Sequence, residues 1–178
     1  MDIRHWFKPE HKADKINPIE KKTITIFTDG SAFNNGKSNC TGGIGVFFGD
    51  GDIRNISELL EIDKVTNNKC ELIACIRAIE QIKNIDLFNL IIFTDSEYLI
   101  KSITLWYDNW EKKNFSGVKN LDLIKLLHKY YKQYNIKLEH VKAHKKKPID
   151  TTSIEYFKWY GNMMADKLAK KCQIDENK

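Results

Sequence analysis

Two segments of strand length in this chain end in an aspartate. Residues 22–28 alternate in polarity, are rich in β-branched side chains and stop at the turn-forming triplet Asp29-Gly30-Ser31. Residues 87–94 form a continuous apolar run that stops at Asp95-Ser96, a pattern typical of a strand covered by helices on both faces. Together they predict a layered α/β sheet, in which groups that follow the strands often bind ligands.

The rest of the chain supplies the other elements of this sheet. Residues 42–48 predict a second strand, and the turn at 49–51 leads to a third strand that runs through Ile53 to Leu59. Apolar spacing and capping residues predict helices at 66–83, 97–106, 121–134 and 160–171, and alternation predicts a fifth strand at 136–141. The expected fold class is therefore α/β, with a five-stranded mixed sheet (an antiparallel meander plus parallel strands) flanked by helices.

Length and composition limit the number of domains and the class of partner. The 178 residues suit one compact domain, and a hydrophobic content of 42% excludes a wholly disordered chain. Residues 1–21 are polar and carry Pro9 and Pro18, so we expect a flexible N-terminal tail followed by a single domain at 22–174. The net charge of +5 favours a polyanionic partner such as nucleic acid.

Membrane and secretory signals are absent from the sequence. No apolar run reaches the roughly 18 residues of a membrane span, and the charged N-terminal segment lacks the apolar core of a signal peptide. We therefore expect an intracellular protein, cytoplasmic or nuclear, that is monomeric and has no membrane partner. The four cysteines have no CxxC spacing and are expected to be buried thiols.

Four carboxylates are candidates for one metal site. Asp29 and Asp95 follow strands, Glu71 falls in the first turn of the first helix, and Asp166 falls in the first half of the last helix. Taken singly, each aspartate after a strand can be a simple turn former. Carboxylates from several elements that converge at one sheet edge suit Mg²⁺, which takes hard oxygen ligands and keeps waters for phosphate oxygens.

The local sequences around these acids resemble the ordered motifs of type 1 ribonuclease H. The resemblance covers about residues 23–172 and is carried by Thr28-Asp29-Gly30-Ser31, Thr66-Asn67-Asn68-Lys69-Cys70-Glu71-Leu72, Thr94-Asp95-Ser96, His140-Val141-Lys142-Ala143-His144 and the segment from Gly161 to Ala169. It implies a ribonuclease H-like fold and an endonuclease that hydrolyses the RNA strand of RNA/DNA hybrids. The products implied are 5′-phosphate and 3′-hydroxyl ends, and the implied role is removal of primers or R-loops.

The resemblance also implies catalytic roles for particular residues. Asp29, Glu71, Asp95 and Asp166 are similar to the family's ligands for two Mg²⁺ ions, with Mn²⁺ as a substitute. His144 resembles the loop histidine that shuttles a proton or aids product release. The alternative of a zinc site built from His140 and His144 lacks the HExxH spacing and a nearby cysteine, so we interpret His140 as structural.

Substrate contacts are implied on both strands of the hybrid. Asn35, Asn67 and Asn68 resemble residues that contact the RNA strand. Turn and cap chemistry is the alternative, and it is favoured for Asn35 taken alone but not for Asn67 within its motif. The residues that resemble the DNA-strand contacts are Lys64, Thr66, Trp106 and Asn120. Trp110 and neighbouring lysines resemble a weakened form of the family's basic protrusion, and Trp110 is equally explained as core packing.

Four features depart from the family pattern or lie outside it. The segment 145–160 is long and lysine-rich, Ala143 replaces a glycine, and Met163 stands where a glutamate is common. At the N-terminus, Ile3, Trp6 and Phe7 resemble a sliding-clamp-binding peptide, and a tail that merely packs on the domain is the alternative.

Two other functions stay open: another nuclease of the superfamily, such as a junction resolvase, and a non-catalytic hybrid-binding module.

Overall fold

The strands form one mixed sheet. The computed structural model describes residues 21–33, 41–143 and 145–175, and within them five strands pair in the order β3-β2-β1-β4-β5. β2 pairs antiparallel with β1 and β3, whereas β4 pairs parallel with β1 and β5. The bounds are Lys22–Phe33 for β1, Thr41–Phe47 for β2, Ile56–Leu60 for β3, Phe88–Thr94 for β4 and Ile136–His140 for β5.

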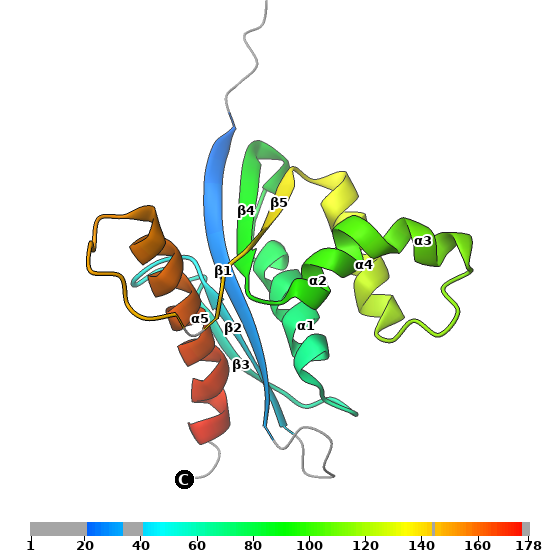
Figure 1. The fold of residues 1–178 in the computed structure, drawn as a ribbon, viewed down its shortest axis with the longest axis horizontal. Helices are drawn as coiled ribbons and strands as arrows, with labels where there is room; N and C mark the ends of the chain where they lie inside the picture. The colour runs from blue at the N-terminus through cyan, green and yellow to red at the C-terminus, as the bar shows by residue number, and fades with distance from the viewer. Residues whose placement is uncertain (1–20, 34–40, 144, 176–178) are drawn as a thin grey trace, which may run out of the picture.

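Helices cover both faces of this sheet (Figure 1). The single helix α5 lies on one face, and α1 with α4 lies on the other, as the ribbon shows. In chain order between β4 and α4, the helices α2 and α3 are joined by one π-helical turn, η3, and extend away from the sheet. The bounds are Asn67–Glu80 for α1, Ile85–Leu87 for the 3₁₀ turn η2, Glu97–Lys101 for α2, Ser102–Trp106 for η3, Tyr107–Lys112 for α3, Leu121–Gln133 for α4 and Ile154–Asp175 for α5.

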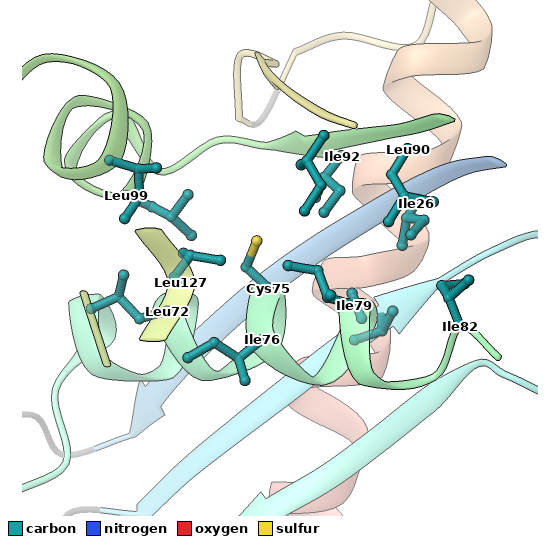
Figure 2. Close-up of a cluster of buried hydrophobic side chains, with 14 of the residues drawn as sticks. Ile26, Leu72, Cys75, Ile76, Ile79, Ile82, Leu90, Ile92, Leu99 and Leu127 are labelled. Carbon is teal, nitrogen blue, oxygen red and sulfur yellow. The ribbon is translucent and has the colours of Figure 1, made fainter. Parts of the chain in front are cut away.

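The main core lies between α1 and the sheet (Figure 2). Apolar residues of α1 recur at intervals of three and four, so they share one face of the helix. That face packs on inward-facing residues of β1 and β4, and Leu127 of α4 and Leu99 of α2 close the cluster. The buried members labelled in the figure on α1, β1 and β4 are Leu72, Cys75, Ile76, Ile79, Ile26, Leu90 and Ile92. This packing fixes the N-terminal end of α1 against the central strands.

Glycines in β2 allow α5 to lie directly on the sheet. A Cβ atom at Gly45 would overlap the carbonyl oxygen of Ala165, and one at Gly43 would overlap that of Ala169. Gly45 is also the register partner of Asp29 in β1. Because these two glycines have no side chain, the middle of α5 can lie next to the strand that carries Asp29.

The third strand starts later than the sequence predicts. Ile53, expected within the strand, lies in a turn and is 98% exposed. Asn55 closes this turn, because its Oδ1 accepts from Phe48 N at 2.7 Å and its Nδ2 donates to Gly49 O at 2.7 Å. These side-chain bonds extend the turn to residue 55, so β3 begins at Ile56.

The last helix starts earlier than predicted. Its first residue is Ile154 rather than Tyr160, and the loop before it is correspondingly shorter. Ser153 caps the helix, because its hydroxyl accepts from Tyr156 N at 3.1 Å. Asp150 orders the preceding turn by accepting from the backbone N–H and the hydroxyl of Thr152.

Several expectations concern residues outside the described part of the chain. These include the N-terminal peptide residues Ile3, Trp6 and Phe7, as well as Asn35 and His144. Cys70 and Cys75 are buried as expected, whereas Cys172 is half-buried and donates from Sγ to Ala169 O at 3.2 Å. Across the described ranges, no helix combines the length and the apolar character needed to cross a bilayer.

Candidate active site

Asp29 and Asp95 lie at the same edge of the sheet. β1 and β4 are parallel neighbours, and the last residue pair in their register is Thr28 with Thr94. Asp29 and Asp95 directly follow this pair, so both carboxylates emerge where β4 ends. The prediction that the first strand stops at Asp29-Gly30-Ser31 is wrong, because β1 stays paired with β2 through these residues as far as Phe33. Asp29 therefore lies within β1, beside the point where β4 ends.

Glu71 reaches this edge from α1. Thr66 caps the helix by accepting from Lys69 N, so Glu71 falls in its second turn. A Cβ atom at Gly30 would overlap the backbone of Cys70 and Glu71, and its absence allows α1 to touch β1. The Gly30 N–H donates to the Glu71 carboxylate, and the Thr94 hydroxyl lies 3.5 Å from Glu71 Oε2.

The three carboxylates form a compact cluster. One oxygen from each of Asp29, Glu71 and Asp95 lies within 4.8 Å of the other two. Asp29 is 6% exposed and Glu71 is 7% exposed, while Asp95 is half-buried. The site therefore concentrates negative charge in a place that water reaches poorly.

Burial and mutual repulsion alter the protonation of this cluster. Burial first, and then the charges of Asp95 and Asp166, raise the pKa of Asp29 to about 7. Burial, followed by the charges of Asp29 and Asp95, raises the pKa of Glu71 well above its ordinary value. A bound divalent cation would favour the ionised forms that these effects disfavour. The all-oxygen donor set consequently fits a hard cation such as Mg²⁺ or Mn²⁺.

Asp166 lies beside the cluster rather than within it. It shares a cavity of about 370 Å³ with Asp95, and Lys142, Lys145, Trp159, Asn162 and Met163 complete the lining. Lys170, one turn further along α5, forms an ion pair with Asp166 at 2.6 Å. Three of the four predicted carboxylates thus come together directly, and the fourth acts on Asp29 through its charge.

His140 holds the backbone of Asp95 in place. Its Nε2 lies 3.2 Å from the carbonyl oxygen of Asp95, which requires that this ring nitrogen carry the proton. Val141 N donates to the carbonyl oxygen of Thr94, which extends the link between β5 and the end of β4. These bonds support the structural role expected for His140.

Comparison with protein-family models matches this chain to RNase H over residues 21–173. The chain belongs to the RNase H family. Ribonuclease H of Schizosaccharomyces pombe is 40% identical over 151 residues, which cover 82% of this chain and 51% of that protein. Ribonuclease H of Campylobacter jejuni is 36% identical over 131 residues, which cover 69% of this chain and 80% of that protein. The chain spans about half the length of the ribonuclease H proteins of Schizosaccharomyces pombe and Saccharomyces cerevisiae.

Solved structures of RNase H proteins share the fold. LC9-RNase H1, a type 1 RNase H, gives a TM-score of 0.59 at 24% identity and covers 85% of this chain and 74% of its own. RNase H1 from Halobacterium salinarum gives 0.52 at 19% identity, with coverage of 86% and 98%. The predicted α/β class, mixed sheet and type 1 RNase H family are confirmed.

A second cavity of this RNase H chain gathers several predicted DNA-strand residues. It has a volume of about 410 Å³ and lies beside the N-terminal end of α1. Thr66 and Asn120, two of the residues expected to contact DNA, line it, and Asn68, expected to face RNA, lines it too. Its lining consists of Thr66, Asn68, Tyr98, Trp110, Ser116, Gly117, Val118, Lys119 and Asn120.

Two predicted DNA-strand residues, Lys64 and Trp106, are not in this lining. Trp106 instead packs against Tyr98 and Trp110, with ring centroids at 6.2 and 5.6 Å. Of the two tryptophans, Trp110 lines the cavity, and Trp106 packs against it. A π-helical turn at Ser102–Trp106 precedes α3.

Asn67 has a structural task at the start of α1. Its Oδ1 accepts from the backbone N–H of Ala32 at 2.8 Å, which ties the helix to β1. Asn67 is not the helix cap, since Thr66 holds that position, and its contact with RNA stays a prediction. Asn67 and Asn68 are both exposed.

Sequence reasoning missed two residues near the carboxylates. Asn162 donates from Nδ2 to Asp95 Oδ2 at 3.4 Å, and Trp159 donates from Nε1 to Lys145 O at 3.0 Å. Asn162 precedes Asp166 by four residues, a spacing that places the two on one helix face. That spacing indicates the shared face with Asp166, but the bond to Asp95 depends on how α5 packs against the end of β4.

Proposed function

We propose that this chain is an endonuclease that hydrolyses the RNA strand of RNA/DNA hybrids and leaves 5′-phosphate and 3′-hydroxyl ends. The observation that carries the proposal is the cluster of Asp29, Glu71 and Asp95, whose oxygens lie within 4.8 Å of one another. Membership of the RNase H family supports the choice of substrate. Removal of primers or R-loops is the use that this activity serves.

Asp29, Glu71, Asp95 and Asp166 would hold the divalent cations, with Mg²⁺ as the natural choice. When bound at such a site, two cations activate the attacking water and stabilise the leaving 3′ oxygen of a phosphodiester. Asp29 is the central ligand in this proposal, because it is buried and lies between Glu71 and Asp95 on adjoining elements.

The protein's own contribution is to keep the carboxylates fixed and poorly solvated. The Gly30 N–H holds Glu71, and His140 holds the backbone of Asp95. Such fixed groups need no reorganisation when charge develops on the phosphate. Lys170 competes for Asp166 until a cation or the substrate arrives.

The second cavity would hold the DNA strand. Thr66, Asn68 and Asn120 present hydroxyl and amide groups there, and Lys119 adds positive charge. Phosphate contacts of this kind set the position of a duplex without reading its sequence. We therefore propose weak sequence preference, with Asn67 and Asn35 contacting the RNA strand.

Cleavage of a labelled RNA/DNA hybrid tests the proposal. The wild-type chain should cut the RNA strand with Mg²⁺, should not cut with chelator, and should leave matched RNA/RNA and DNA/DNA duplexes intact. Asp95→Asn should lose at least about 10²-fold in rate, since it removes a cation ligand. Asp86→Asn, an exposed aspartate in η2, serves as the matched control.

Two outcomes would contradict this function. Cutting that survives in chelator or in Asp95→Asn would show that the carboxylate cluster is not the catalytic centre. Tight binding of the hybrid without cleavage would identify a non-catalytic binding module instead.

A further inference from the structure

Asn162 is a buried amide next to the carboxylate cluster. It lies on α5, is 7% exposed and lines the cavity that it shares with Asp95 and Asp166. Its Nδ2 donates to Asp95 Oδ2 at 3.4 Å. Figure 1 shows α5 on the face of the sheet opposite α1, so this bond reaches Asp95 from the other layer.

The other end of the amide is unsatisfied. Asn162 Oδ1 is buried and has no hydrogen-bond partner among the described residues. An acceptor in this state costs folding free energy, because it loses its bonds to water. An apolar side chain of the same size would avoid that cost. The N–H bond to Asp95, rather than close packing of the side chain, therefore explains why an asparagine occupies this position.

Asp95 is held at both ends by this arrangement. His140 bonds its backbone carbonyl, and Asn162 bonds one oxygen of its carboxylate. Because Asn162 is neutral, it can orient the carboxylate without cancelling the charge that attracts a cation. A lysine in its place would cancel that charge, as Lys170 does in part for Asp166.

We propose that Asn162 is a positioning residue of the cation site, which orients Asp95 so that its other oxygen faces Asp29 and Glu71. This inference rests on the function proposed above, since it concerns the same site. Partners that orient a metal ligand typically change metal affinity about 10-fold or more when removed. Asn162 acts through Asp95 and need not touch the substrate.

The test measures cation affinity and stability of the substrate-free, full-length protein. For Asn162→Leu we expect the MgCl₂ concentration that gives half of the thermal shift to rise about 10-fold. The Tm in chelator should stay the same or rise, because the unsatisfied acceptor is gone. Asp86→Asn, a change at an exposed residue of η2 outside the cavity, should alter neither quantity.

Kinetics separate positioning from a general loss of structure. In hybrid cleavage, Asn162→Leu should need more Mg²⁺ for half-maximal rate while the KM for the hybrid stays constant. Asn162→Ala provides the same comparison if the leucine variant does not fold.

Distinct outcomes overturn the inference or the function beneath it. A variant with lower Tm in chelator and an unchanged Mg²⁺ requirement would show that Asn162 is only structural. If the wild-type chain shows no Mg²⁺-dependent shift and no cleavage, the proposed function fails and this inference fails with it. If the wild type shows both and Asn162→Leu matches it, only the inference fails.

Discussion

At the scale of single residues, the site buries carboxyl groups that carry charge when they are ionised. Asp29 is almost fully buried, and its pKa rises to about 7 because of desolvation and the charges of Asp95 and Asp166. The unfolded chain holds this carboxyl at its ordinary pKa of 3.8. Between these two values the folded protein binds a proton that the unfolded chain lacks. The stability of the cation-free protein therefore falls as pH rises from about 4 to about 7 and stays low above it.

Asp29→Asn should remove this pH dependence. In chelator at pH 8 we expect the variant to be more stable than the wild type by roughly 2–4 kcal/mol, and at pH 4 we expect the difference to be small. Urea unfolding of both proteins at the two pH values measures the effect. Asp86→Asn is the control, and equal stability of wild type and Asp29→Asn at pH 8 would contradict the prediction.

The residues also differ in how far the sequence predicted them. Asp95 was predictable because it directly follows β4. Asp29 was predicted at the end of its strand, but it lies within β1, which stays paired with β2 as far as Phe33. Asn162 was not predictable, since its role depends on a contact between α5 and the end of β4 that no local period reports. The lining of the second cavity includes Trp110 and not the predicted Trp106. Side-chain spacing at 3.6 residues per turn also cannot reveal the π-helical turn that ends at Trp106.

At the scale of elements, α5 and β2 are in unusually close contact. Gly43 and Gly45 have no side chains to separate the helix from the strand, so helix carbonyls lie where their Cβ atoms would be. Because Gly45 pairs with Asp29, this contact also sets how near Asp166 lies to Asp29. The strands themselves were predictable from alternation, but the ends of β3 and α5 depended on side-chain bonds of Asn55 and Ser153.

Gly45→Ala should push α5 away from the sheet. We expect a loss of about 1–3 kcal/mol in stability from overpacking, together with a higher Mg²⁺ requirement for cleavage because Asp166 moves with the helix. Thermal unfolding and a Mg²⁺ titration of activity measure the two effects. Ile53→Ala changes a fully exposed side chain and should stay within about 0.5 kcal/mol of wild type. Unchanged stability and Mg²⁺ dependence in Gly45→Ala would refute this account of the contact.

At the scale of the whole molecule, the candidate site has two cavities, of which the second lies beside the start of α1. One carries Asp95 and Asp166, and the other carries Thr66, Asn120 and Lys119. A duplex whose RNA strand meets the carboxylates can place its DNA strand in the second cavity, consistent with the net charge of +5. The overall charge hinted at such a partner from sequence, but only the fold brings the two cavities together.

Lys119→Ala should weaken hybrid binding in a salt-dependent manner. One lost phosphate contact should reduce the slope of log affinity against log salt by about 1. The rate at saturating hybrid should be unchanged, because Lys119 lies away from the carboxylates, in the second cavity. Lys83→Ala, beyond the opposite end of α1, is the matched control. Equal salt slopes for Lys119→Ala and wild type would place the DNA strand elsewhere.

The carboxylates come from layers on both sides of one sheet, since Glu71 belongs to α1 and Asp166 belongs to α5. A folding intermediate in which only α1 has docked holds three of the four carboxylates and lacks the last. Completing the cation site therefore depends on completing the fold. Under the proposed function, cleavage therefore requires α5 to dock, and a ligand that requires all four acids would slow unfolding without accelerating the first steps of folding.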